Sequence, residues 1–230
     1  MTRAFIDLHC HTSASFDCLA KPASVVRAAA ARGLTHLVIT DHDGIDGALA
    51  ARDAAPAGLT VIVGEEVRTA DGDLICAFLT SAIPPGRSAV ETIAAARSQG
   101  ALVGIPHPFD RFRGSLAKGV PLDALAPLVD WVGVHNARLV GGGNERAATF
   151  ASDHELAGVA VSDAHSVLEV AVAYTALDGD PSTPSGLLAS LATAEIVPGR
   201  ASHFVRLWTP AAKTIQRLRG HGRIHPEVPA

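Results

Sequence analysis

Residues 5–17, FIDLHCHTSASFD, begin as an apolar strand and end in side chains that commonly bind metal ions. His9 and His11 are two residues apart, and residues i and i+2 of a strand point to the same face. Both imidazoles could therefore hold one cation, and Asp17 follows closely in the sequence. Two exposed histidines in a polar loop would give the same pattern, but the position at the end of an apolar run favours a metal site.

Other short motifs also place titratable residues directly after an apolar run. They are TDHD (40–43), GEE (64–66), PHP (106–108), VHN (134–136) and SDAH (162–165). Asp163 and His165 repeat the i, i+2 spacing, although Asp163 could instead cap a following helix. Glu65 and Glu66 are neighbours, so only one of them can face a given side of a strand. The spacing alone leaves open which one it is.

His42 lies between two carboxylates. A metal-bound imidazole usually donates its second N–H to a carboxylate or a carbonyl, so Asp41 or Asp43 could orient His42. Asp43 also stands where the N-cap of a helix over residues 45–54 is expected.

Two arginines follow His107 in the segment IPHPFDRFR. Prolines on both sides restrict the backbone at His107. Arg111 and Arg113 then lie on a loop, and a guanidinium matches the oxygens of a phosphate. Both are candidate substrate-binding residues, although two solvated surface arginines would look the same.

Alternation of apolar runs with helical patterns indicates an α/β fold. Strands are predicted at 4–9, 35–40, 59–66, 74–79, 101–106, 131–135, 158–162 and 173–177. Helices are predicted near 22–32, 45–54, 88–99, 121–128, 144–155 and 184–192, with Pro22 and Ser88 at helix starts. This order builds a parallel sheet with helices outside, and about seven such units favour a closed or nearly closed barrel. The motifs then fall at the carboxyl ends of strands, where βα barrels build active sites.

The domain organisation expected is one barrel domain over residues 1–209 and a C-terminal surface extension over 210–230. The extension begins basic and then carries prolines, which suggests a surface helix followed by a loose end.

Composition narrows the class of partner and the compartment. The formal net charge is −4, which gives no general attraction for nucleic acid, and no duplex is expected as a partner. Aromatic residues make up 4% of the chain, which argues against a stacking platform for single strands. Three cysteines without CxxC spacing argue against a disulfide framework and favour a reducing compartment. With no signal peptide or apolar span recognised, we expect a cytoplasmic protein with no membrane contact. The oligomeric state is left open.

The candidate ligands are nitrogen and oxygen atoms, which suit Zn²⁺, Mn²⁺ or Fe. They are too many for one ion, so two or three clustered divalent ions are expected. Such clusters hydrolyse phosphate esters, because bound ions activate water and hold the attacking and leaving oxygens. No GxSxG, Walker or dinucleotide-binding motif competes with this interpretation.

The ordered set HxH, TDH, GEE, PHP and SDAH resembles the PHP family, named for polymerase and histidinol phosphatase. The resemblance implies a distorted seven-stranded, TIM-like β/α barrel with a trinuclear metal centre at the carboxyl ends of the strands. It also implies a phosphoesterase that acts on a small phosphorylated substrate, a nucleotide or a short oligonucleotide.

The resemblance also implies a role for each matching residue. His9, His11 and Asp163 would hold the first ion, Glu66 would bridge the first and second, and His107 would hold the second. The third ion would be held by Asp17, His42 and His165. The residues implied at the catalytic centre are Asp17, His42, Glu66 and His165.

The second site departs from the family pattern. Members usually carry a histidine shortly after the GxE strand, and Asp73 occupies the aligned position here. Carboxylate in place of imidazole is a plausible ligand exchange, with Cys76 as the fallback ligand. His135 is a further departure, interpreted as an extra ligand or a substrate contact.

Two alternative functions remain at this point. A metal-bound hydroxide also attacks carbonyl groups, so hydrolysis in the manner of an amidohydrolase is one. The other is a metal-stabilised barrel without catalysis that serves as a regulatory or binding module.

Overall fold

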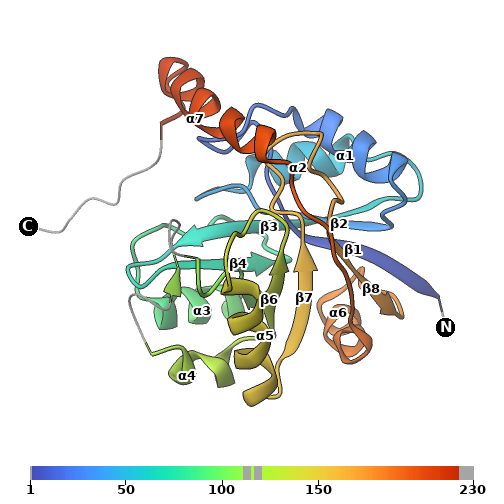
Figure 1. Ribbon diagram of the computed structural model, residues 1–230, viewed down its shortest axis with the longest axis vertical. Coiled ribbons are helices and arrows are strands. Elements are labelled where there is room, and N and C mark those ends of the chain that lie inside the picture. Colours follow the sequence, from blue (N-terminus) through green and yellow to red (C-terminus); the bar gives the residue numbers. More distant parts are fainter. Residues whose placement is uncertain (1, 111–114, 117–120, 223–230) are drawn as a thin grey trace, which may run out of the picture.

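The computed structural model describes residues 2–110, 115–116 and 121–222, which form a sheet surrounded by helices (Figure 1). The strands are β1 (Arg3–Cys10), β2 (His36–Ile39), β3 (Thr60–Arg68), β4 (Asp73–Ala77), β5 (Leu102–Ile105), β6 (Trp131–Asn136), β7 (Ala157–Val161), β8 (Tyr174–Asp178) and β9 (Glu195–Val197). The α-helices are α1 (Pro22–Ala31), α2 (Asp46–Asp53), α3 (Ala89–Ser98), α4 (Leu122–Leu125), α5 (Gly143–Asp153), α6 (Pro184–Ser190) and α7 (His203–Leu218). Short 3₁₀ turns cover Ala126–Leu128 and Leu191–Thr193.

The fold is α/β with a nearly closed, barrel-like sheet, but the expected number of strands was wrong. The described residues form nine strands, not seven, in the order β7-β6-β5-β4-β3-β2-β1-β8-β9. β9 was missed because it is only three residues long, too short for a strand pattern. Two expected helix starts are confirmed, since α1 begins at Pro22 and Ser88 caps α3 in a capping box with Glu91.

The sequence predicted a parallel sheet, but the sheet is mixed. β1 to β3 and β5 to β7 are parallel, whereas β4 is antiparallel to both of its neighbours and β8 is antiparallel to β1 and β9. β4 runs antiparallel because only four residues separate it from β3, and a parallel connection needs a crossover of about a dozen residues or more. The start of β4 therefore lies at the carboxyl end of β3.

The barrel is drawn together where β1 and β7 end. The amide of Asp163 donates to the carbonyl of His9, and the amide of His11 donates to the carbonyl of Ala164, both at 2.9 Å. Lower down, Thr175 on β8 bonds through its hydroxyl to the backbone of Ala160 on β7. The residues after β7 thus complete the sheet at the end that carries the polar motifs.

Apolar side chains fill the interior of the barrel below this end. The interior cluster includes Ile6, Leu8, Ile62, Ile75 and the fully buried Trp131. A second apolar cluster lies between the strands and the outer helices, and burial on both sides explains why most strands read as continuous apolar runs.

The C-terminal region of the described chain forms α7. α7 lies at the same end of the molecule as α1 and α2 (Figure 1), and it begins at His203, so residue 210 falls inside this helix. The boundary expected at 209/210 stays a prediction. No helix in the described part of the chain has the length and apolar character needed to cross a membrane.

Gly104 on β5 gives a test of the barrel interior. A Cβ at this position would lie 2.1 Å from the indole ring of Trp131 on the paired strand β6. We expect Gly104→Ala to lower the free energy of unfolding by ~1–3 kcal/mol, the usual cost of overpacking, in urea denaturation. Gly142→Ala is the control, because its Cβ would meet nothing closer than 3.9 Å. Equal stability of both variants would contradict the described packing.

Candidate metal centre

A β-bulge near the end of β1 turns two histidines into the barrel. Ile6 and Leu8 face the interior, so simple alternation would turn His9 outward. The register with β2 shifts between Asp7 and Cys10, which places an extra residue on β1. The buried Asp7 carboxylate accepts from the amide of His9 at 3.3 Å and from the amide of Ser162 at 3.1 Å, and so supports the bulge.

β3 continues without a bulge, and its alternation separates the two glutamates. Ile62 lies in the interior cluster, and Glu66 follows four residues later on the same face. Glu65 lies on the opposite face, where it accepts from the amide of Ile83 at 2.9 Å. Burial raises the pKa of Glu65 to about 8, so this side chain is mostly protonated at neutral pH.

The buried Glu66 carboxylate is the centre of the polar cluster. Its Oε2 lies 3.2 Å from Nε2 of His9, 3.3 Å from Nε2 of His11 and 3.3 Å from Nδ1 of His42. Its Oε1 lies 3.2 Å from Nε2 of His107, which follows β5. One carboxylate thus contacts four imidazoles that come from three separate parts of the chain.

The remaining candidates complete three ligand groups around Glu66. Asp163 Oδ1 lies 3.6 Å from Nε2 of His9 and 3.5 Å from Nε2 of His11. Asp17 Oδ2 lies 3.3 Å from Nε2 of His165 and 3.6 Å from Nε2 of His42. Within each group the candidate ligand atoms lie within 4.8 Å of one another: His9, His11 and Asp163; Glu66, Asp73 and His107; His11, His42 and His165.

Asp73 reaches the site from the start of an antiparallel strand. It is the first residue of β4 and pairs with Arg68 at the end of β3. Because β4 runs in the opposite direction to β3, its first residue lies at the same edge of the sheet as the ends of the parallel strands. This placement brings Asp73 to Glu66 and His107 without a loop of its own.

Two imidazoles of the cluster are neutral near pH 7. Burial holds the pKa of His11 well below its usual range, and the neighbouring histidines add to the effect. Burial also lowers the pKa of His165, to about 4, although the Asp17 carboxylate opposes it. Neutral imidazoles have a free lone pair, which is the form that binds metals.

The pKa values of His42, Asp17 and Glu66 shift in the direction that favours the charged forms. Burial alone would lower the pKa of His42, but Glu66 and Asp17 outweigh it and raise the pKa to about 9. Burial opposes ionisation of Asp17 and Glu66, yet the imidazoles around them hold both pKa values well below the usual range. A cation that enters this group must therefore displace a proton from His42.

The donor set fits divalent cations. Nε2 of His9 and Nε2 of His11 lie 3.0 Å apart, both buried and aimed at the same carboxylates. Oδ1 of Asp17 is buried without a hydrogen-bond partner among the described residues, which is costly for a carboxylate. Imidazole nitrogens and carboxylate oxygens in this arrangement suit Zn²⁺, Mn²⁺ or Fe.

The two residues of the VHN motif take different places because β6 also has a bulge. Its register with β7 shifts between Gly133 and His135. Asn136 then donates from Nδ2 to Oδ2 of Asp163 at 2.9 Å, whereas Nε2 of His135 lies 2.8 Å from the carbonyl oxygen of Gly199. His135 belongs to none of the three ligand groups among the described residues. Sequence reasoning missed the role of Asn136, since a bulge leaves no periodic signal.

Asp41 supports the site through Ser15 and Thr12. It accepts from the amide and the hydroxyl of Thr12, both at 2.6 Å, and from Oγ of Ser15 at 2.9 Å. Oγ of Ser15 lies 3.1 Å from Nδ1 of His11, so the carboxylate orients His11 through Ser15. The expected helix cap at Asp43 was wrong: Ile45 is the N-cap of α2, and Asp43 accepts from the amide of Arg68.

Backbone strain also marks this region. Asp163 has φ 52° and Asp43 has φ 54°, values in the left-handed region that few residues other than glycine adopt. Such conformations persist where the surroundings determine them strongly, and they cluster at functional sites.

A cavity of about 290 Å³ opens beside His42. Its walls include Phe16, Asp43 and Gly44 on one side, and Gly220 and His221 after α7 on the other. Arg111 and Arg113, the candidate phosphate-binding residues, lie outside the described residues.

Comparisons with protein families match most of the chain. Residues 7–127 match the family model described as the PHP domain, and residues 141–196 match a model described as PHP-associated. An uncharacterized protein of Methanocaldococcus jannaschii is 33% identical over 114 residues, which cover 45% of this chain and 67% of that protein.

Solved structures share the fold at low sequence identity. A two-domain protein from Bacteroides vulgatus, described as containing a predicted PHP-like metal-dependent phosphoesterase, has a TM-score of 0.73 and 21% identity over 86% of this chain. An endonuclease Q bound to duplex DNA with an abasic lesion has a TM-score of 0.61 and 15% identity over 83% of this chain. This chain spans 65% of the first structure's chain and 57% of the second's.

Exchange of each glutamate for glutamine tests the centre. We expect Glu66→Gln to weaken metal binding by more than the ~10–100-fold that loss of an outer partner costs, because a neutral amide is a poor ligand between cations. Glu65→Gln should leave binding unchanged, since Glu65 lies on the other face and is mostly protonated. Equilibrium dialysis with Mn²⁺ and elemental analysis measure both. If Glu65→Gln weakened metal binding more than Glu66→Gln, Glu65 and not Glu66 would face the interior, and the register of β3 would be shifted by one residue.

Proposed function

Because the chain belongs to the PHP domain family, we propose that it hydrolyses a phosphate ester through a centre of two or three divalent metal ions. The proposed substrate is a phosphomonoester, a nucleotide or a short oligonucleotide. The observation that carries the proposal is the convergence of three ligand groups on the buried Glu66 carboxylate. Converging buried titratable groups of this number are costly to fold, so a chemical role explains them better than a structural one.

We assign the ligands by group. The first ion is held by His9, His11 and Asp163, the second by Glu66, Asp73 and His107, and the third by Asp17, His42 and His165, with Glu66 bridging the first two. Zn²⁺, Mn²⁺ and Fe are all compatible with these donors. Asp17, His42, Glu66 and His165 are the proposed catalytic residues.

When bound, such ions lower the pKa of water and neutralise phosphate oxygens. The chain contributes orientation and charge. Asn136 fixes Asp163, and Asp41 fixes His11 through Ser15, so the ligands are held before a substrate arrives. Asp17 Oδ2, close to both His42 and His165, balances the charge of whichever imidazole holds a proton.

The cavity beside His42 supports a small substrate. Its volume of about 290 Å³ is at the lower end of the range for pockets that bind small molecules. We propose that Arg111 and Arg113, which follow His107 in the sequence, bind the phosphate. Endonuclease Q binds duplex DNA with a similar fold, so a duplex belongs among the substrates to be tested.

A reducing compartment such as the cytoplasm is part of the same proposal. It is supported by Cys10, Cys18 and Cys76, which are buried and form no disulfide with one another.

A substrate panel tests the function. The protein is purified without chelator, its metals are counted, and hydrolysis is measured with added Mn²⁺ or Zn²⁺. The panel contains phosphomonoesters, mononucleotides, short single strands, a duplex with an abasic site and an amide. Turnover of phosphomonoesters or short strands is expected. Turnover of the amide alone would indicate amidohydrolase chemistry instead.

Metal removal gives the most direct check. We expect two to three ions per chain. Dialysis against a chelator should remove the ions and abolish turnover, and turnover should recover when Mn²⁺ is returned. The physical reason is that the bound ions are the groups proposed to activate water and to hold the attacking and leaving oxygens, and the side chains that remain without them supply neither role. Full activity of rigorously metal-free protein would refute the proposal.

Asp73 offers a test of metal preference. The group of Glu66, Asp73 and His107 has two carboxylates, which favours oxygen-preferring ions such as Mn²⁺ over Zn²⁺. We expect Asp73→His to keep activity and shift the preference towards Zn²⁺, and Asp73→Ala to lose one ion and most of the rate. Asp71→Ala is the control, because Asp71 caps the start of α3 at Ala89 and is in none of the groups. Unchanged metal content in Asp73→Ala would show that Asp73 is not a metal ligand and only begins β4.

A further inference from the structure

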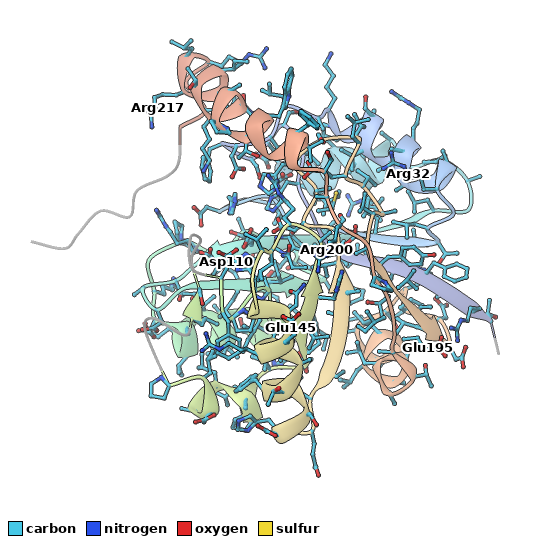
Figure 2. The ribbon with its side chains drawn as sticks, viewed as in Figure 1. Arg32, Asp110, Glu145, Glu195, Arg200 and Arg217 are labelled. Carbon is cyan, nitrogen blue, oxygen red and sulfur yellow. The ribbon has the colours of Figure 1, made fainter. Side chains whose placement is uncertain are left out.

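α7 lies beyond both segments that match the family models, yet it contacts the segments that carry two candidate ligands. The matches end at residue 196, and α7 covers His203–Leu218. The described side chains of α7 include both buried and exposed ones. Ala212 and Gln216 are buried, whereas Arg217 is exposed and projects away from the molecule (Figure 2).

The first connection runs from Gln216 to the loop between β1 and α1. Nε2 of Gln216 lies 2.7 Å from the carbonyl oxygen of Ser13, 3.0 Å from that of Ser15 and 2.8 Å from that of Cys18. Carbonyl oxygens only accept hydrogen bonds, so they face the amide nitrogen of Gln216, whose two N–H groups are shared among the three acceptors. Asp17 lies between two of these three residues.

The second connection runs from Thr209 to the segment after β7. Nη2 of Arg138 donates to Oγ1 of Thr209 at 2.7 Å, and Nε of Arg138 lies 3.4 Å from Oε1 of Glu169. Oε2 of Glu169 accepts from the amide of His165 at 3.2 Å and from Oγ of Ser166 at 2.8 Å. α7 is thus joined through Arg138 and Glu169 to the backbone of His165.

Both connections end at the same pair of ligands. Asp17 Oδ2 and Nε2 of His165 lie 3.3 Å apart, and Sγ of Cys18 lies 3.2 Å from the carbonyl oxygen of His165. Asp17 comes from a loop, not from a strand, so the ladder of the sheet does not fix its position.

We propose that α7 positions the third metal site, with Gln216 holding the Asp17 loop and Thr209 holding the His165 segment through Arg138. Gln216 and Thr209 are positioning residues that contact no ion themselves. This inference rests on the proposed function only in assuming that Asp17, His42 and His165 bind an ion.

Matched substitutions in the full-length protein test the role of α7. Gln216→Leu keeps the size of the side chain and removes its donors, and Thr209→Val removes one hydroxyl. Thr214→Val is the control, because Thr214 is exposed and its hydroxyl, among the described residues, bonds to Pro210 within the helix. Calorimetric titration of metal-free protein with Mn²⁺ counts the sites and gives the affinity of each.

We expect Gln216→Leu and Thr209→Val each to weaken one site about tenfold or more and to leave the others unchanged, as for residues that orient ligands. Amide hydrogen exchange over residues 13–18 should become faster in Gln216→Leu, and Thr214→Val should match the wild type. A lower melting temperature with every Mn²⁺ site unchanged would overturn the proposal. If Gln216→Leu does not fold, Thr209→Val decides alone.

The outcome is separable from the proposed function. One weakened Mn²⁺ site in the variants, with no phosphoester turned over by the wild type, would support the positioning role and refute the phosphoesterase. Wild-type hydrolysis with only two ions bound, both unaffected in the variants, would refute the positioning role alone.

Discussion

The balance of charge around Glu66 constrains the rest of the structure. A buried carboxylate needs compensating positive charge, and Glu66, which lies within 3.3 Å of four imidazoles, can receive it from a protonated histidine or from a bound cation. Burial keeps His11 and His165 unprotonated, while Glu66 and Asp17 keep a proton on His42. Metal binding therefore exchanges protons for ions in a site that folding has already assembled, and affinity must fall as the pH falls.

The backbone meets this constraint with local irregularities, not with extended loops. Bulges in β1 and β6 reverse the alternation of each strand near its end. The barrel interior is therefore apolar along the strands and polar at their carboxyl ends. Asp7 stabilises the first bulge from behind by accepting the amides of His9 and Ser162. After β7, the left-handed backbone conformation of Asp163 is the local irregularity that turns the chain from the sheet into the site.

The class of fold and the convergence of most candidate ligands could be predicted from the sequence, because strand ends are visible as apolar runs followed by polar motifs. The resemblance to the PHP family is confirmed by the family match over residues 7–127. The number of strands was wrong, since three residues at Glu195–Val197 carry no periodic signal. The antiparallel direction of β4 was readable from its short connection to β3, but the alternation of strands and helices elsewhere masked it.

Contacts between distant segments were beyond sequence reasoning. Nothing near Gln216 indicates that its amide meets three carbonyls some 200 residues earlier in the chain, because such contacts depend on where two helices and a loop lie in space. The contact of Asn136 with Asp163 was likewise not predicted, since the bulge in β6 decides which residue of this motif reaches Asp163.

The hairpin between β3 and β4 has a consequence for how this barrel can diversify. Most candidate ligands follow a strand that leads into a helix or a long connection, so their replacement disturbs the connection as well. Asp73 instead begins a strand after a four-residue turn, and its backbone is fixed by pairing with Arg68. Natural variation can therefore exchange the side chain at this one position while the scaffold stays constant. An organism's supply of metals could select among such exchanges without a new fold having to evolve.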